Sequence, residues 1–332
     1  MQHRTLGRSG IRASIIGLGT WSLSGWMWGG TDEAVAIKTV HAALDAGINL
    51  IDTAPAYGVG VAEQLVAKAI VGRRDKVVLA TKCGLVWHTR EGAYHEEQWG
   101  RQIYRFLGPQ SIRFEVEASL QRLGTDYIDL YQTHWQDPTT PIEDTMEALV
   151  RLKQEGKIRA IGISNVSLEQ FQRYDARGPI DSLQEEYNML NRSVEVQLLP
   201  HCQAKGVALI AYSPVAQGLL TGRISPDREF PEGDFRRQHP RFSRENRVKA
   251  AGLMQAIEPI AHRHGVPLAH VAIAWTISPG HVTHSLVGAR TPEQARESAA
   301  AAALVLSERE VAEINRQVEK HAPDVPHLLQ GS

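Results

Sequence analysis

The sequence predicts an α/β fold in which eight parallel strands, each followed by a helix, close into a (β/α)8 or TIM barrel. Short apolar or β-branched segments alternate with longer amphipathic segments along the 332 residues, which is typical of repeated strand–helix units. Eight such short segments occur, and eight parallel strands close a barrel of this kind. Polar side chains directly follow several of these short segments. In barrels of this kind the active site lies at the C-terminal ends of the strands, where such side chains are found.

The expected strands are four to eight residues long and consist mainly of apolar and β-branched residues. Segments of this length and composition are typical of strands that are buried on both faces. Ahead of them, residues 4–14 predict two short strands around a Gly/Ser turn, a hairpin placed to close the bottom of the barrel. The eight strands are expected at residues 14–19, 49–52, 76–82, 127–134, 158–164, 182–188, 208–213 and 283–288.

Ordinary start and stop signals mark the helices between these strands. Residues 31–47 have an acidic first turn and stop at a glycine, and residues 292–302 begin with a proline. A Ser-x-x-Glu start predicts one additional C-terminal helix at residues 307–320. Since no linker rich in Pro, Gly or Ser interrupts this order, residues 1–332 are expected to form a single domain.

An open, doubly wound sheet is the alternative architecture, and it makes a different demand on the sequence. A dinucleotide-binding sheet normally carries GxGxxG directly after its first strand. The two nearest matches, GLGTWS and GVGVAE, both lack the third glycine, and neither a phosphate-binding GxxxxGK[ST] loop nor a GxSxG motif occurs. The closed barrel is therefore favoured.

Composition excludes several classes of partner. The net charge is -1 and the isoelectric point about 6.9, so no basic excess favours nucleic acid or an anionic membrane, and a small molecule is expected instead. The chain begins without an apolar signal core and has no apolar run of membrane-spanning length. Its two cysteines, Cys83 and Cys202, lie far apart and fit a reducing compartment, so a cytoplasmic location is expected.

Four chemically active side chains stand at the ends of the second, third and fourth expected strands. Asp52 ends the second strand and Tyr57 follows it in a Pro/Gly turn, while Lys82 and His134 end the next two strands. Each has an ordinary interpretation alone: a capping carboxylate, a solvated lysine, a turn aromatic and a core imidazole. Together at one barrel mouth, the four would be costly to keep without pairing or function.

The set suits proton transfer to a carbonyl oxygen. A free phenol has a pKa near 10 and donates poorly at neutral pH unless a cation lowers that value. Lys82 is placed to supply the cation, Asp52 to hold it charged, and His134 to hydrogen-bond the carbonyl oxygen. The carbonyl carbon then needs a hydride.

These residues lie in segments that resemble the aldo-keto reductases along essentially the whole chain. Within that family the chain is most similar to the bacterial branch related to inositol-operon and general-stress reductases and to the potassium-channel β subunits. The segments that carry the resemblance, in chain order, are IGLGTWS, AGINLIDTAPAYG, VVLATKCG, LGTDYIDLYQTHW, EGKIRAIGISN, QEEYNMLNR, AYSPVAQGLLTGR and VGARTPEQARES.

The resemblance implies a catalytic tetrad of Asp52, Tyr57, Lys82 and His134, with Tyr57 as general acid. It also implies a nicotinamide cofactor whose carboxamide is held at the ends of the fifth and sixth strands, whose ring stacks on Tyr212, and whose pyrophosphate follows residues 213–219. The adenosine end falls at the start of the eighth helix, where backbone N–H groups suit a phosphate in any case. The implied cofactor-binding residues are Thr20, Trp21, Asp52, Ser164, Asn165, Gln184, Tyr212, Ser213, Pro214, Val215, Gln217, Leu219, Arg223, Gly288, Arg290, Gln294, Glu297 and Ser298.

Two positions depart from the family pattern. Ala62-Glu63 stands where members often have Ser-Glu, and Glu297-Ser298 stands where they often have Glu-Asn, an amide that commonly contacts adenine. Arg290 and Arg223 are natural partners for a 2′-phosphate, since guanidinium groups match phosphate oxygens. NADPH is therefore the expected cofactor, with NADH as the alternative.

Two long rim segments are expected to shape specificity. Residues 84–108 follow the third strand and carry, among other aromatic residues, Trp87, Tyr94 and Trp99. Residues 218–246 are long and charged, and are either a lid over the cofactor or a disordered insertion. Tryptophans suggest an aromatic substrate pocket, although several of them would serve as well to pack loops onto the barrel. The expected pocket residues are Trp21, Trp26, Trp28, Trp87 and Trp135.

No metal is expected, because the histidine pairs near residues 262–264 and 281–284 have no nearby carboxylate or cysteine set. The leading functional hypothesis is NADPH-dependent reduction of an aldehyde or ketone. The alternatives are NAD(P)-dependent oxidation of a sugar or other alcohol, and a cofactor-sensing binding protein with little turnover. His134 argues against the last, since the channel-subunit branch has an asparagine at the matching position.

Overall fold

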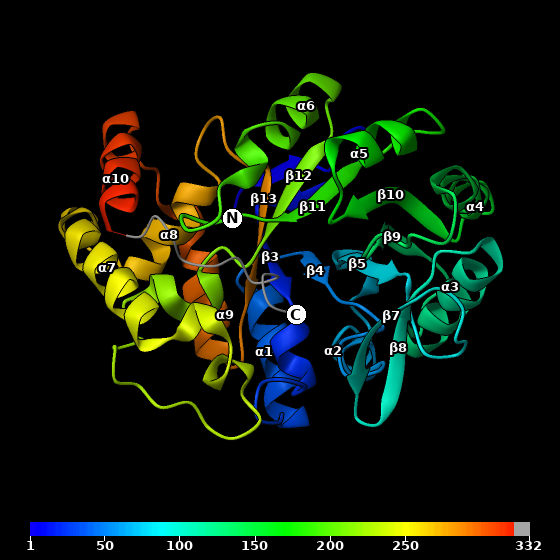
Figure 1. Ribbon diagram of the computed structural model, residues 1–332, viewed down its shortest axis with the longest axis horizontal. Helices are drawn as coiled ribbons and strands as arrows, with labels where there is room; N and C mark the ends of the chain where they lie inside the picture. Colours follow the sequence, from blue (N-terminus) through cyan, green and yellow to red (C-terminus); the bar gives the residue numbers. More distant parts are fainter. Residues whose placement is uncertain (322–332) are drawn as a thin grey trace.

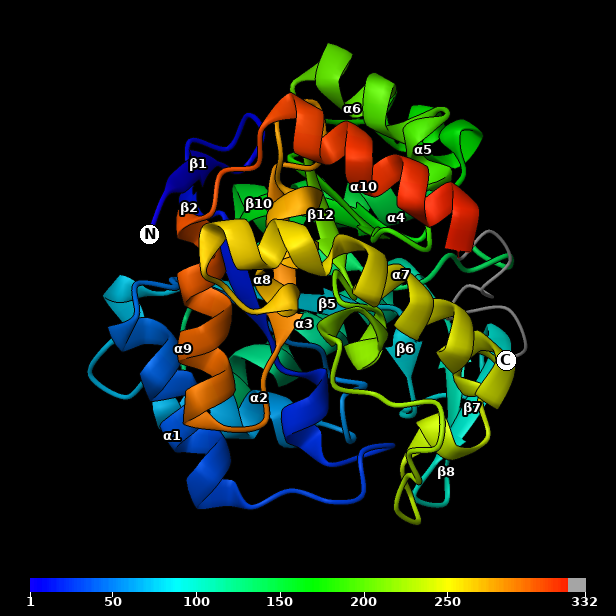
Figure 2. The ribbon, with the colours of Figure 1, turned by 90° about the vertical axis from the view of Figure 1, so that its left-hand side faces the viewer.

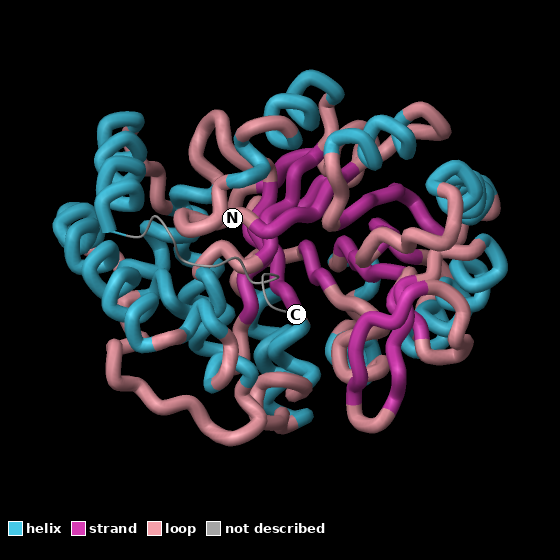
Figure 3. Tube along the Cα trace, in the orientation of Figure 1, coloured by secondary structure: helices cyan, strands magenta, loops and turns pink. Residues whose placement is uncertain are grey.

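The computed structural model describes residues 1–321 and shows the expected closed barrel of eight parallel strands. In Figure 3 the barrel strands occupy the middle of the molecule and helices surround them. Every barrel strand lies inside its predicted range, except that β5 runs one residue further. In barrel order the strands are β3 (Ile16–Gly19), β4 (Leu50–Asp52), β5 (Val78–Cys83), β9 (Ile128–Thr133), β10 (Ile158–Ser164), β11 (Ser182–Glu186), β12 (Ala208–Tyr212) and β13 (His284–Gly288).

Helices cover the outside of the barrel (Figure 1). Their starts follow the expected chemistry: Asp32 and Thr291 each accept a hydrogen bond from a backbone N–H in the first turn of the helix that follows. The helices are α1 (Glu33–Asp45), α2 (Val61–Ala69), α3 (Pro109–Leu123), α4 (Ile142–Gln154), α5 (Leu168–Asp175), α6 (Leu198–Lys205), α7 (Arg244–His264), α8 (Leu268–Thr276), α9 (Pro292–Ala300) and α10 (Glu308–His321).

The predicted N-terminal hairpin closes the bottom of the barrel. Its strands, β1 (His3–Thr5) and β2 (Arg12–Ser14), pair antiparallel. Leu6 and Ile11, in the connection between them, are buried in one apolar cluster with barrel residues such as Leu130. The barrel interior is thus sealed at the N-terminal ends of its strands, which leaves the opposite end for chemistry.

The additional C-terminal helix is also confirmed. The Ser307 N–H donates to Glu310 Oε2 at 3.0 Å, and the Glu310 N–H donates back to Ser307 Oγ at 3.3 Å, which is the reciprocal cap that the Ser-x-x-Glu pattern predicts. α10 lies along α7 (Figure 2). The prediction of one domain over residues 1–332 extends past the described residues and stays a prediction.

The rim segment after β5 contains strands that the sequence did not reveal. β6 (Leu85–Val86), β7 (Ala93–Gln98) and β8 (Arg101–Arg105) form a small antiparallel sheet in the order β6-β8-β7. Trp99 and Gly100 connect β7 to β8 with φ values of 48° and 77°, and two consecutive positive values are characteristic of the tightest hairpin turns. This sheet is missing from the sequence prediction because both faces of β7 are rich in polar residues.

The other rim segment, residues 218–246, is folded. It contains the end of η4 (Ala216–Thr221), the short helices η5 (Phe235–Arg237) and η6 (Pro240–Phe242), and the start of α7. Phe230, Arg241 and Phe242 are buried in it. The alternative of a disordered insertion is therefore wrong.

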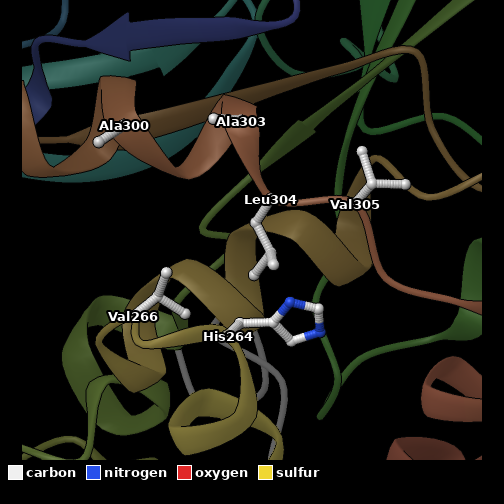
Figure 4. A pocket seen from close by; sticks show the side chains of 6 residues that line it. All are labelled: His264, Val266, Ala300, Ala303, Leu304 and Val305. Carbon is white, nitrogen blue, oxygen red and sulfur yellow. The ribbon is translucent and has the colours of Figure 1, made fainter.

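A cavity of about 390 Å³ lies outside the barrel, between the end of α7 and the residues that follow α9 (Figure 4). Its lining is almost entirely aliphatic, with His264 as the one titratable side chain among those drawn. Because α9 leads away from the strand ends that carry polar side chains, this cavity takes no part in the chemistry described below. Within residues 1–321, no helix has the combined length and apolar character needed to cross a bilayer.

His284 makes the stability of the barrel dependent on pH. The side chain is fully buried at the start of β13, and burial, with Arg4 nearby, lowers its pKa to about 4. Because the unfolded chain binds a proton near pH 6.5 and the folded chain near pH 4, stability falls as the pH drops through this window. A difference of that size corresponds to roughly 3 kcal/mol.

We therefore expect His284→Asn to flatten the loss of stability between pH 6.5 and 4, measured by urea unfolding at several pH values. His262→Asn, at a side chain that is 76% exposed, is the matched control and should leave the slope unchanged. An unchanged slope in the His284 variant would contradict a neutral buried imidazole.

Candidate active site

A buried ion pair forms the floor of the candidate site. Lys82 Nζ donates to Asp52 Oδ1 at 2.6 Å and to the Thr53 carbonyl oxygen at 3.0 Å, and Asp52 and Lys82 are 2% and 1% exposed. The second carboxylate oxygen of Asp52 accepts hydrogen bonds from Gln184 Nε2 at 2.9 Å and Gln132 Nε2 at 3.2 Å. Buried charges are tolerated when they are paired and hydrogen-bonded in this way.

Tyr57 stands above this pair. The turn after β4 brings it back over the barrel, with the Tyr57 N–H donating to the Ala54 carbonyl oxygen and Gly58 at a φ of 66°. Its hydroxyl accepts a hydrogen bond from Lys82 Nζ at 3.2 Å, and its side chain is half-buried. The phenol is therefore tied to the ammonium on one side and open to a ligand on the other.

The pKa of Tyr57 differs from the sequence expectation. Burial raises it above its ordinary value, and this effect outweighs the lowering by Lys82. Burial also works against the charged form of Lys82, but Asp52 and Tyr57 more than offset it and the pKa of the lysine is raised. The site thus holds a protonated phenol beside a charged ammonium, rather than a phenol with a depressed pKa.

His134 completes the group. Its N–H backbone group donates to the Cys83 carbonyl oxygen at 2.8 Å, and its ring meets the Tyr57 ring edge to face at 5.6 Å between centroids. Burial, then Lys82 and His95, holds the pKa of His134 well below its usual range. The imidazole is therefore neutral and offers one N–H donor and one acceptor. The structure brings all four predicted catalytic side chains together.

The predicted nicotinamide-end residues lie on the neighbouring strand ends. Asn165, with a φ of 55°, donates from Nδ2 to the His134 carbonyl oxygen at 2.9 Å and accepts from the Tyr212 hydroxyl at 2.9 Å. Ser164 Oγ is buried and has no hydrogen-bond partner among the described residues, although buried hydroxyls are normally satisfied. An unpartnered hydroxyl beside Asn165 and Gln184 fits a carboxamide, which offers both a donor and an acceptor.

The predicted pyrophosphate segment has an unusual backbone. Ser213, Ala216 and Gln217 have φ values of 57°, 47° and 50°, and such strained non-glycine positions cluster at functional sites. Pro214, Val215 and Leu219 belong to the same segment.

Two arginines that the sequence reasoning missed hold this segment in place. Arg241 Nη1 donates to Gln217 Oε1 at 2.9 Å and pairs with Glu186 at 2.7 Å, while Arg236 Nη1 donates to the Gln217 carbonyl oxygen at 3.2 Å. Gln217 Nε2 in turn bonds Ser213 Oγ. The only signal in the sequence was the charged character of the 218–246 segment.

The predicted adenosine-end residues gather at the start of α9. The Arg290 N–H donates to Gln294 Oε1 at 2.8 Å, and Arg290 Nη2 donates to the Gly30 carbonyl oxygen at 2.9 Å. Arg223 pairs with Glu297 at 2.7 Å. Nearby on the barrel, Thr20 Oγ1 donates to the Asp52 carbonyl oxygen at 3.0 Å, Gly288 pairs with Gly19, and Ser298 is buried on α9.

The predicted pocket tryptophans divide between two places. Trp21 and Trp28 meet edge to face at 5.3 Å between centroids, and Phe235 from the 218–246 segment packs on both. Trp87 and Trp135 instead pack on the apolar cluster beneath the β7–β8 hairpin. Trp26 is half-buried in the loop after η1 (Trp21–Ser24). The hairpin residues His95 and Trp99, which lie close to His134 and Gly58, were not among the predicted site residues.

Comparison with known proteins agrees with this geometry. A model of the aldo/keto reductase family matches residues 15–319. The aldo-keto reductase YhdN of Bacillus subtilis (strain 168) is 39% identical over 327 residues, which cover 98% of this chain and 96% of that protein. The NADH-specific methylglyoxal reductase of Escherichia coli (strain K12) is 41% identical over 325 residues, which cover 96% of this chain and 99% of that protein.

Solved structures give the same result. The glycerol dehydrogenase AKR11B4 from Gluconobacter oxydans superposes with a TM-score of 0.87 at 35% identity, covering 99% of this chain and 98% of that chain. An aldo/keto reductase from Klebsiella pneumoniae in complex with NADP and acetate gives a TM-score of 0.72 at 30% identity, with 98% and 97% covered. Because family match and relatives alike extend along nearly the whole chain, the protein belongs to the aldo-keto reductase family and is an NAD(P)H-dependent oxidoreductase.

Proposed function

We propose that this enzyme reduces an aldehyde or ketone to the alcohol with NADPH, and that Tyr57 is the general acid. The observation that carries the proposal is the position of the Tyr57 hydroxyl, 3.2 Å from Lys82 Nζ and above a buried Lys82–Asp52 pair. A phenol that is fixed from below and half-exposed above is placed to give its proton to a bound oxygen.

The charges of the tetrad support this role. The raised pKa of Tyr57 keeps its proton in place until an acceptor arrives. Once the proton has left, the Lys82 ammonium stabilises the phenolate, and Asp52 keeps that ammonium charged. Neutral His134 directs a hydrogen bond at the carbonyl oxygen and so orients the substrate. The reduced nicotinamide, when bound, supplies the hydride that the carbonyl carbon needs.

We assign the cofactor to the strand ends beside the tetrad. The carboxamide falls to Ser164, Asn165 and Gln184, and the unpartnered Ser164 hydroxyl supports this assignment. Tyr212, whose hydroxyl bonds Asn165, is assigned to the nicotinamide ring. Residues 213–219 are assigned to the pyrophosphate. The 218–246 segment, whose arginines Arg236 and Arg241 hydrogen-bond Gln217, is assigned as a cover over the pyrophosphate.

We propose a preference for NADPH, with Arg290 binding the 2′-phosphate. Arg290 lies at the start of α9, where a guanidinium and the helix N-terminus both favour an anion. Arg223 is paired with Glu297, so Arg290 is the stronger of the two predicted partners for the 2′-phosphate. The Klebsiella pneumoniae structure with NADP supports this preference, whereas the Escherichia coli relative named as NADH-specific represents the alternative.

The same groups would also run the reverse reaction, with Tyr57 accepting the proton of an alcohol. The relative named glycerol dehydrogenase favours this second direction, and the relative named methylglyoxal reductase favours the first. Both names support a small-molecule substrate. Since Cys83 and Cys202 are both free thiols, we place the reaction in the cytoplasm.

Tyr57→Phe should lower kcat/KM for carbonyl reduction by about 10²- to 10⁴-fold, because it removes the proton donor. Cofactor affinity, measured by fluorescence titration, should change little. Tyr127→Phe, at the opposite end of the barrel directly before β9, is the matched control and should keep full activity. Full turnover by Tyr57→Phe would show that the acid role is misassigned.

Arg290→Ala should raise KM for NADPH by about tenfold or more and leave KM for NADH within about threefold, because a charged hydrogen bond to phosphate is lost only with the first. Arg296→Ala, at a side chain on α9 that is 61% exposed and pairs with Glu293, serves as control. Equal changes for both cofactors would remove Arg290 from the 2′-phosphate site.

A further inference from the structure

The β7–β8 hairpin lies against the catalytic residues. At Gly58, directly after Tyr57, a Cβ would come within 3.0 Å of the Trp99 ring at the tip of the hairpin. On the inner side of the hairpin, Ala56, Leu85 and Ile103 form an apolar cluster on which Trp87 and Trp135 pack. The hairpin therefore forms one wall of the space above Tyr57 and His134.

His95 is the one residue of this wall that the strand pairing singles out. Tyr94 pairs with Tyr104 and Glu96 with Ile103, so His95 is an extra residue in β7 with no partner on β8. Such a β-bulge redirects a side chain, and bulges are common beside active sites.

The His95 imidazole packs beside the residue that follows His134 in the chain. Its ring lies 5.7 Å from the Trp135 ring, between centroids, and Trp135 directly follows His134. His95 is also one of the groups that lower the pKa of His134, after burial and Lys82.

The imidazole of His95 is neutral and free to bind. Burial, then Arg105, lowers its pKa to about 4, so it carries one donor and one acceptor at neutral pH. Among residues 1–321 no hydrogen bond to this ring occurs; the nearest carboxylate oxygen, on Glu96, is 4.0 Å from Nε2. Its side chain is 23% exposed, so a ligand can reach the ring and replace solvent there.

A second unsatisfied group lies on the same strand. Gln98 is 1% exposed and donates from Nε2 to Glu96 Oε1 at 2.8 Å, yet its own Oε1 has no partner among the described residues. Gln98 Oε1 is therefore a buried acceptor on β7 that the described residues leave unused.

We propose that His95 is a substrate-specificity residue that hydrogen-bonds a second oxygen of the substrate, one or two carbons from the reacting carbonyl. Resting on the proposed function, this inference names its substrate class: small oxygenated carbonyl compounds such as α-hydroxy ketones and α-hydroxy aldehydes. Unsubstituted alkyl carbonyls leave the imidazole unpartnered and are poorer substrates.

Hydroxyacetone and butanone test the proposal, because they differ only in a hydroxyl in place of a methyl group. Wild-type enzyme should favour hydroxyacetone by about tenfold or more in kcat/KM, since a site that hydrogen-bonds a hydroxyl discriminates against the analogue without it. His95→Phe keeps the ring beside Trp135 and removes both nitrogens. It should reduce the preference to about threefold or less, mainly through a higher KM for hydroxyacetone.

Two further variants separate this role from a structural one. His95→Gln retains a donor and an acceptor and should restore most of the preference. Glu97→Gln changes an exposed residue of the same strand and should leave the preference for hydroxyacetone unchanged. The wild-type preference should also be constant from pH 6 to 9, where the imidazole stays neutral.

If His95→Phe lowered kcat/KM equally for hydroxyacetone and butanone, the proposal would be overturned, and His95 would instead have a general role in positioning His134. An unchanged preference in His95→Phe would overturn it as well. Failure of the proposed function looks different: wild-type enzyme would reduce neither ketone with either cofactor, or Tyr57→Phe would retain full turnover.

Discussion

The buried pair of Lys82 and Asp52 is the interaction on which the rest of the site depends. Each charge alone would be strongly unfavourable in the barrel interior, and removal of one partner from such a pair typically costs about 3–5 kcal/mol. The protein satisfies the pair with groups from neighbouring strands: a carbonyl after β4 and side-chain amides from β9 and β11. Strand closure and charge burial therefore support each other, because the polar groups meet only when the barrel is closed.

The pair also determines the charges above it. Lys82 opposes ionisation of His134, while the burial of Tyr57 opposes ionisation of the phenol more strongly than the lysine favours it. Tyr57 and His134 are consequently both neutral. The Tyr57 phenol keeps its proton, and the His134 imidazole carries a proton on only one of its two nitrogens. A carbonyl oxygen placed between them meets two hydrogen-bonding groups and a single fixed cation below, which suits an oxygen that becomes more negative during reduction.

Much of this arrangement is encoded in short-range sequence features. Strand length and β-branched composition located the barrel strands, and the residues at their ends gave the tetrad that the structure brings together. What the sequence could not supply was the balance of opposing effects: the direction of the pKa shift of Tyr57 depends on its burial, which only the folded chain sets. Arg241 was missed for a similar reason, because a charged residue in a charged segment gives no sign that it is fully buried against Glu186. The β7–β8 sheet was missed because polar residues occupy both faces of β7, and the bulge at His95 further interrupts the alternation by which a strand is recognised.

The hairpin has a consequence for how this scaffold changes. β6, β7 and β8 pair only with one another among the described strands, so no hydrogen bond of the barrel ladder runs through them. The hairpin can therefore change without altering the strand pairing that positions Asp52 and Lys82. Under the role proposed for His95, substrate preference is carried by a segment outside the barrel ladder, so a change of preferred carbonyl compound would leave the ladder beneath the tetrad intact.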